Sequence, residues 1–252
     1  MKTDPRLAVV VMAAGKGTRM KDPSMAKVMY PINGKPMIEY VVDLATRLGS
    51  SKTVAVVGWQ KDSVIDYMQS KGKPVHCVEQ SPQLGTGHAV MQAEESLNGF
   101  AGDVLVLSGD VPLLSDVTVR RLIQAHRYSK AAATVLTAEV KEPRGYGRIL
   151  RDKDDAVVGI IEEKDADEAQ RNIREINSGI YVFDSGRLFE GLKNITPSNV
   201  QKEYYLTDIL GYFWSNKWIV RAVVAENERE IQGINTVQQL EEARAVMAGG
   251  AG

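Results

Sequence analysis

The chain has 252 residues, of which 44% are hydrophobic and 25% charged, the balance of an ordinary globular protein. Its 31 basic and 32 acidic residues give a net charge of −1, which predicts neither a nucleic-acid partner nor an anionic-membrane surface. No stretch approaches the ~20 apolar residues of a membrane span, and the first residues lack the apolar core of a signal peptide. The single cysteine, Cys77, cannot form an internal disulfide, so we expect a cytoplasmic protein.

Short apolar runs alternate with helical periodicity through the first half of the chain. Strands are predicted over residues 7–12, 53–57, 75–78 and 104–107, and helices over 36–48, from about 62 to 69 and from about 87. This order predicts a parallel sheet wound with helices. Ligands of such sheets bind at the carboxyl ends of the strands.

The pattern changes from about residue 131. Strands joined by turns are predicted over 134–140, 147–151 and 157–161, then a strand over 177–183 and helices over 207–214 and 237–247. We therefore predict an α/β, Rossmann-like fold in a single domain, residues 1–252. We expect a mostly parallel mixed sheet flanked by helices, with one part over about residues 7–130 and a second part over about 131–240 that contains a small antiparallel or mixed sector.

The most informative segment is MAAGKGTR, residues 12–19, which is followed by Lys27. Glycines after a strand let the backbone approach a ligand closely, and successive N–H groups suit phosphate oxygens. Lys16, Arg19 and Lys27 add positive charge. A dinucleotide-binding loop would need a third glycine where Met20 stands, and no GxxxxGK[ST] pattern occurs, so a dehydrogenase and a P-loop kinase are disfavoured.

Eight motifs carry a family resemblance. They are MAAGKGTRM with a following lysine, EQSPQLGTGHA, SGDVPLL, GYGRI, GIIEEKDA, INSGIYVF, EYYLTDI and GIN. In this order they closely resemble the uridyltransferase domain of the bacterial bifunctional N-acetylglucosamine-1-phosphate uridyltransferase/glucosamine-1-phosphate acetyltransferase family, over about residues 7–240. The resemblance implies a nucleotidyltransferase fold and a Mg²⁺-dependent reaction of UTP with N-acetylglucosamine 1-phosphate. The products would be pyrophosphate and UDP-N-acetylglucosamine, a cell-wall precursor.

The resemblance also implies a nucleotide site in the first part of the chain and a sugar-phosphate site in the second. An amide side chain can both donate to and accept from a base edge, and the resemblance assigns Gln80 to the uracil. The implied nucleotide site comprises Met12, Ala13, Ala14, Gly15, Lys16, Gly17, Gln80, Gly85, Thr86, Ser108 and Gly109. The implied sugar-phosphate site comprises Gly147, Glu162, Lys164, Asn177 and Thr207.

Asp110 follows a predicted strand through Ser108 and Gly109, which places a carboxylate at the strand's carboxyl end. Mg²⁺ prefers oxygen ligands and keeps several waters, so one carboxylate with substrate phosphates suffices, and the resemblance adds Asn235 as a second protein ligand. By the same resemblance, catalysis should depend on Arg19, Lys27 and Asp110. His88 could be a catalytic base, but we interpret it as a helix-surface or packing residue, because attack by a phosphate oxygen requires no proton removal.

Some features leave alternatives open. Ala26 stands where the family usually has a proline, and Ser108 where it often has an aromatic residue. No hexapeptide repeat follows, so we expect no acetyltransferase domain, and the chain is either single-function or trimmed. The rival functions are transfer to another sugar 1-phosphate, such as glucose 1-phosphate, and a non-catalytic regulatory subunit that binds nucleotide sugars. Glu163 and Asp165 are interpreted as solvated charges, whereas residues 203–205 either shape the sugar wall or form a structural turn.

Overall fold

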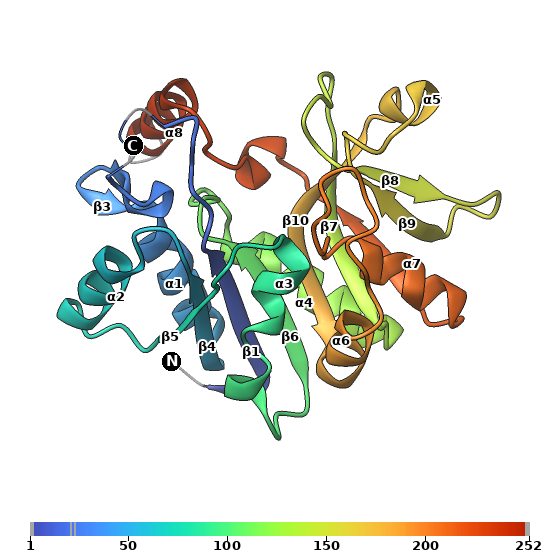
Figure 1. Cartoon of the computed structure of the whole chain (residues 1–252), viewed down its shortest axis with the longest axis horizontal. Coiled ribbons are helices and arrows are strands. Elements are labelled where there is room, and N and C mark those ends of the chain that lie inside the picture. Colours follow the sequence, from blue (N-terminus) through green and yellow to red (C-terminus); the bar gives the residue numbers. More distant parts are fainter. Residues whose placement is uncertain (1–2, 21, 23, 250–252) are drawn as a thin grey trace.

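The computed structural model of the chain describes residues 3–20, 22 and 24–249. Within these residues one large sheet runs in the order β11 (Val220–Val224), β7 (Ala133–Glu139), β10 (Glu175–Asp184), β6 (Asp103–Ser108), β1 (Asp4–Ala13), β4 (Ser50–Val57) and β5 (His76–Glu79) (Figure 1). Two further strands, β8 (Arg148–Arg151) and β9 (Val157–Ile161), branch from β10 as an antiparallel pair.

Strand β1 lies inside the sheet and is buried on both faces. It pairs in parallel with β4 and with β6, and β4 pairs in parallel with β5. Leu7, Val9 and Val11 contribute to the core on one face, whereas Ala8 and Val10 contribute to the core on the other. This alternation explains why the sequence reads as a continuous apolar run.

Helices cover both faces of the sheet. One core is completed by α1 (Met37–Leu48), α2 (Lys61–Ser70) and α4 (Asp116–Ser129), and the other by α3 (Thr86–Met91), α6 (Ser185–Leu192) and α7 (Asp208–Ser215). Figure 1 shows α6 and α7 together beside β10 and β7. The remaining elements are η1 (Lys27–Met29), β2 (Pro31–Ile32), β3 (Lys35–Pro36), η2 (Glu95–Leu97), α5 (Glu168–Arg171), η3 (Glu228–Ile231) and α8 (Val237–Gly249). In the described part of the chain, no helix has the length and apolar character to span a membrane.

The predicted α/β fold is confirmed, with differences that lie mainly in the second half. Every strand and helix predicted before residue 108 is present with small shifts at its ends, and Gly49, whose φ is 80°, caps the C-terminus of α1. Strands β7 and β10 belong to the main sheet, whereas β8 and β9 form an antiparallel branch and β2 and β3 form a separate antiparallel pair. Helices α4 and α6 and strand β11 were not predicted. The sequence contained a signal for α4, because serine is a preferred N-cap residue. In the structure Ser115 caps α4, and its side chain accepts from the N–H of Thr118.

A small third core fastens the end of the chain to its beginning. Met20, Ile32 and Met37 pack with residues of the C-terminal segment that include Leu240 and Ala243. Helix α8 contacts β2 although they are far apart in sequence, and Figure 1 shows α8 at the same side of the molecule as the segment that contains β3. This packing brings the segment before α8 to the carboxyl end of β1.

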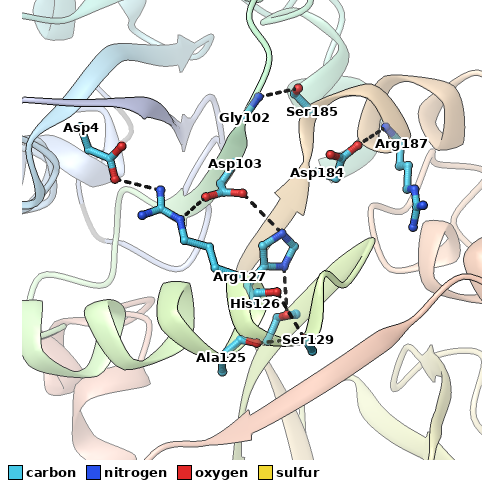
Figure 2. Close-up of polar contacts among 11 residues, drawn as sticks. Asp4, Gly102, Asp103, Ala125, His126, Arg127, Ser129, Asp184, Ser185 and Arg187 are labelled. Carbon is cyan, nitrogen blue, oxygen red and sulfur yellow. Dashed lines mark hydrogen bonds and ion pairs between the residues drawn. The ribbon is translucent and has the colours of Figure 1, made fainter.

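A polar network joins α4 to the amino ends of β1 and β6 (Figure 2). Arg127 forms ion pairs with Asp103 at the start of β6 and with Asp4 at the start of β1, the latter with 2.8 Å between Nη2 and Oδ2. The neighbouring His126 is buried, and its Nδ1 lies 3.0 Å from Oγ1 of Thr134. Burial lowers the pKa of His126, so the ring is neutral at neutral pH.

We predict that Arg127→Met lowers the free energy of unfolding by about 1–3 kcal/mol, because it leaves two partly buried carboxylates without their cation. Urea denaturation at pH 7.5 measures the change. The matched control is Lys193→Met, which removes an ion pair to Glu94 whose side chains are 66% and 44% exposed. The control should change stability by less than about 0.5 kcal/mol. Equal losses in the two variants would contradict the prediction.

Candidate functional site

A cavity of about 280 Å³ opens at the carboxyl ends of β1, β5 and β6. The structure brings most of the predicted nucleotide residues to its wall, together with two of the predicted catalytic residues. These are Met12, Ala13, Ala14, Gly15, Gln80, Gly85, Thr86 and Ser108, with Lys27 and Asp110. Three residues of the wall, Val28, Gln83 and Ala89, were absent from the predicted site, and Glu203, which had been interpreted as part of the sugar wall or of a structural turn, also lines this cavity.

The turn after β1 is tight because Lys27 packs against it. Gly17 has a φ of +60°, and a Cβ at this position would lie only 2.6 Å from Cβ of Lys27. Any side chain there would collide with the lysine, so glycine is required. Lys16 lies to one side, with its Nζ 5.8 Å from the centre of the Trp59 ring. Gly109 lies under the turn and donates its N–H to the carbonyl of Met12 at 2.9 Å.

Gln80 is 4% exposed and follows β5 directly. Its Nε2 donates to the carbonyl oxygen of Gly85 at 2.9 Å and lies 3.1 Å from Nδ1 of His88. Both amide hydrogens are therefore directed into the protein. The amide was expected to offer a donor and an acceptor to a base, but this arrangement leaves only Oε1 for the cavity.

The loop at Gly85 is held by a segment from the far end of the chain. Gly87 donates its N–H to the carbonyl of Tyr204 at 2.7 Å, and Tyr204 donates to the carbonyl of Leu84 at 2.8 Å. The hydroxyl of Thr86 accepts from the N–H of Leu206 at 3.0 Å. Residues 203–205 thus form a structural brace, and Glu203 lines this cavity.

Four predicted residues meet at one side of the cavity as a cluster, here called the cation cluster: Arg19, Lys27, Asp110 and Asn235. Lys27 Nζ contacts Oδ2 of Asp110 and lies 3.0 Å from Oδ1 of Asn235. Arg19 Nη2 donates to the same Oδ1 at 3.0 Å. The amide nitrogen of Asn235 donates to the carbonyl of Gly233 at 3.1 Å, which turns Oδ1 toward the two cations.

The cation cluster fits a hard metal ion. In residues 3–20, 22 and 24–249, no group of three or more His, Cys, Asp and Glu side chains is arranged to hold a metal. The oxygens of Asp110 and Asn235 nevertheless converge on one positive charge, the ammonium of Lys27. A carboxylate and an amide oxygen are suitable ligands for a Mg²⁺ that keeps waters and binds substrate phosphates. At Gly233 a Cβ would lie 3.5 Å from Oδ2 of Asp110, so its small size keeps this space open.

Four of the predicted sugar-phosphate residues also come together. Asn177 donates its N–H to the carbonyl of Gly147 at 2.9 Å, and the Thr207 hydroxyl donates to Oε1 of Glu162 at 3.0 Å. A Cβ at Gly147 would lie 3.4 Å from Oε2 of Glu162 and 3.5 Å from Cβ of Asn177. The cluster thus offers the carboxylate of Glu162 and the amide of Asn177 beside Gly147, which has no side chain.

This side of the molecule carries buried negative charge. Burial raises the pKa of Glu162, and the carboxylates of Asp208 and Asp165 raise it further. Burial and the charge of Asp165 likewise raise the pKa of Asp208 to about 6. These three residues and Tyr205 line a second cavity of about 410 Å³. A phosphate would be repelled here, whereas hydroxyl and amide groups could donate to the carboxylates.

Two neighbouring charges differ from expectation. Lys164 does not join the cluster around Glu162 but is exposed and contacts the side chain of Gln201. Glu163 was interpreted as a solvated charge, and this was wrong. It accepts from Nη2 of Arg148 at 2.6 Å, and Arg148 is only 1% exposed. The same Nη2 also donates to the carbonyl of Arg171, the last residue of α5, at 3.2 Å.

Comparisons with known proteins agree with this geometry. A family model described as nucleotidyl transferase matches residues 8–230. A protein named bifunctional protein GlmU from Syntrophotalea carbinolica is 49% identical over 247 residues, which cover 98% of this chain and 52% of that protein. The protein of the same name from Heliobacterium modesticaldum is 48% identical over 238 residues, which cover 94% and 51%. The chain therefore spans about half the length of these curated relatives.

Solved structures extend the comparison to the fold. A UDP-glucose pyrophosphorylase complexed with UDP-glucose superposes with a TM-score of 0.77 at 21% identity, over 99% of this chain and 100% of that one. A putative glucose-1-phosphate thymidylyltransferase from Bacillus anthracis gives 0.75 at 20% identity, over 95% and 94%. These likenesses confirm the predicted nucleotidyltransferase fold. With the family model matching most of its length, the chain belongs to the nucleotidyl transferase family, as its ordered motifs predicted.

Proposed function

We propose that this chain is a Mg²⁺-dependent sugar-1-phosphate uridylyltransferase that makes UDP-N-acetylglucosamine and pyrophosphate from UTP and N-acetylglucosamine 1-phosphate. One observation carries the proposal: a single cavity joins the amide of Gln80 to Lys27 and Asp110 of the cation cluster. A nucleoside triphosphate needs both, because its base requires directed hydrogen bonds and its phosphates require positive charge.

The reaction is an in-line displacement at phosphorus. An oxygen of the sugar phosphate forms a bond to the α-phosphorus of UTP as the bond to pyrophosphate breaks. Lys27 and Arg19 would neutralise charge on the triphosphate and on the leaving pyrophosphate, and Asp110 with Asn235 would hold the metal. When bound, Mg²⁺ supplies further positive charge to the phosphates. Catalysis is then positioning and charge neutralisation, without a covalent nucleophile.

The sugar would lie against Gly147, with its polar groups toward Glu162, Asn177 and Thr207. Asn177 accepts at Oδ1 from the N–H of Gly179 and from the hydroxyl of Tyr181, both at 2.9 Å, so its Nδ2 is the atom left to donate. Lys164 is exposed and contacts Gln201, so it would bind the phosphate of the sugar substrate only after its side chain leaves Gln201.

Pyrophosphate release tests the proposal directly. The purified chain is assayed with UTP, CTP and dTTP against N-acetylglucosamine 1-phosphate, glucosamine 1-phosphate and glucose 1-phosphate. The proposal expects the highest kcat/KM for UTP with N-acetylglucosamine 1-phosphate. Preference for glucose 1-phosphate would assign another sugar, and binding without any turnover would indicate a regulatory subunit.

Asp110→Asn should lower kcat/KM at least about a hundredfold, because the variant loses the only carboxylate of the cation cluster. Activity is measured over a Mg²⁺ series, and urea denaturation shows whether the variant is folded. The matched control is Asp155→Asn in an exposed turn, where φ is 63° and asparagine is well tolerated. Near-normal activity of Asp110→Asn at limiting Mg²⁺ would show that Asp110 is not a metal ligand.

UTP should be preferred over CTP roughly tenfold to a hundredfold in kcat/KM, since a mismatched buried hydrogen bond costs about 1–3 kcal/mol. Oε1 of Gln80 can accept from N3–H of uracil, whereas cytosine offers a lone pair at that position. Gln80→Ala should remove most of the preference. Gln83→Ala removes another amide from the same cavity wall and should leave the preference for UTP unchanged. Equal use of UTP and CTP by the unmodified chain would rule out Gln80 as the base reader.

A further inference from the structure

We infer that His88 is a specificity-determining positioning residue: its Nδ1 accepts from the Gln80 amide and keeps Oε1 of that amide turned toward the nucleobase. The inference rests on the proposed function, because it names the part of the site that discriminates uracil from cytosine. The sequence had favoured a helix-surface or packing role for His88 over that of a catalytic base.

The first step is the orientation of the Gln80 amide. A carbonyl oxygen can only accept, so the amide atom that lies 2.9 Å from the Gly85 oxygen must be the nitrogen. The same nitrogen lies 3.1 Å from Nδ1 of His88, so each of its hydrogens has an acceptor. Among the residues that the structure describes, none donates to Oε1, and Gln80 lines the cavity.

The second step is the state of the imidazole. Burial lowers the pKa of His88, so the ring is neutral at neutral pH and has a single acceptor nitrogen. Gln92 is a second possible donor to the ring, because its amide nitrogen lies 3.3 Å from Nε2 of His88. The amide nitrogen of Gln92 already donates to the backbone carbonyl of His88 at 2.9 Å. Gln80 is almost fully buried and lies closer to the ring, whereas Gln92 is partly exposed. The tautomer with its hydrogen on Nε2 leaves Nδ1 as the acceptor. It therefore gives a hydrogen-bond partner to the buried amide of Gln80, which cannot reach water.

The third step is that the ring is held in place. His88 lies in the first turn of α3, and its ring centre is 6.3 Å from that of Tyr204. Tyr204 is fixed through backbone hydrogen bonds with Leu84 and Gly87, on either side of the Gly85 turn. One brace therefore positions both acceptors of the Gln80 amide, the Gly85 carbonyl and the imidazole.

The consequence concerns the flipped amide. With His88 present, exchanging the oxygen and nitrogen of Gln80 breaks two hydrogen bonds and sets two oxygens face to face at Gly85. Without the imidazole, the hydrogen bond from Gln80 to His88 is absent, and only the bond to the Gly85 carbonyl opposes the flipped amide. The flipped amide would present N–H groups to the cavity, which suit N3 of cytosine and oppose N3–H of uracil. Loss of the acceptor should therefore weaken discrimination between the two bases.

Two variants at one position separate an acceptor from a packing residue. His88→Leu keeps bulk but removes the acceptor, whereas His88→Asn can place Oδ1 near the position of the imidazole Nδ1. We expect His88→Leu to lower the UTP-to-CTP ratio of kcat/KM by about tenfold or more, and His88→Asn to restore it to within about threefold of the unmodified chain. The ratio of UTP to CTP dissociation constants, measured by calorimetry without sugar phosphate, should change in parallel.

The background of Gln80→Ala provides the decisive control. If His88 acts through Gln80, His88→Leu should leave the base ratio unchanged when Gln80 is already alanine. The inference is overturned if His88→Leu keeps the ratio, if His88→Asn fails to restore it, or if the effect persists without Gln80. Failure of the proposed function would show differently, as absence of pyrophosphate release by the unmodified chain, and the calorimetric ratios would still test His88.

Discussion

Burial of β1 on both faces is the constraint on which the site depends. Because β4 and β6 both pair with β1 in parallel, Val10 lies between Val54 and Val106, and all three strands end at one edge. The loops that leave this edge are tied to β1: Gly109 donates to the carbonyl of Met12, and Trp59 donates at 3.2 Å to that of Ala14. Met12 and Ala13, which line the cavity, therefore belong to a strand that cannot shift without exposing both cores.

Backbone carbonyls at this edge also orient the two amides that matter most. Gly85 accepts from Nε2 of Gln80, and Gly233 accepts from Nδ2 of Asn235. In each case a fixed acceptor settles which way the amide points, and the amide oxygen is left for another partner. For Asn235 that partner is the positive charge of Lys27 and Arg19. For Gln80, under the proposed function, it is the base.

Sequence reasoning predicted the first half of the fold well because one physical signal, the alternation of buried strands and amphipathic helices, governs it. The motif residues converge because the carboxyl ends of parallel strands meet. Asn235 could be placed only by resemblance, since the packing of α8 on Met20 and Ile32 is a long-range contact. Glu203 enters the cavity for a similar reason, because backbone bonds of Tyr204 to a distant loop carry it there. The role of His88 depended on a 3.1 Å contact that no periodicity encodes.

The charges divide the molecule into two unlike halves. Cations gather where the strands β1 and β6 end, whereas Glu162, Asp165 and Asp208 gather around the antiparallel branch and α7. Burial and mutual repulsion raise the pKa values of Glu162 and Asp208. Ionising these carboxylates therefore costs more free energy than ionising exposed ones. A sugar 1-phosphate has a matching asymmetry, with an anion at one end and hydroxyl donors at the other. Under the proposed function, the electrostatic field would align it with its phosphate toward the cation cluster, the orientation that attack on a bound triphosphate requires.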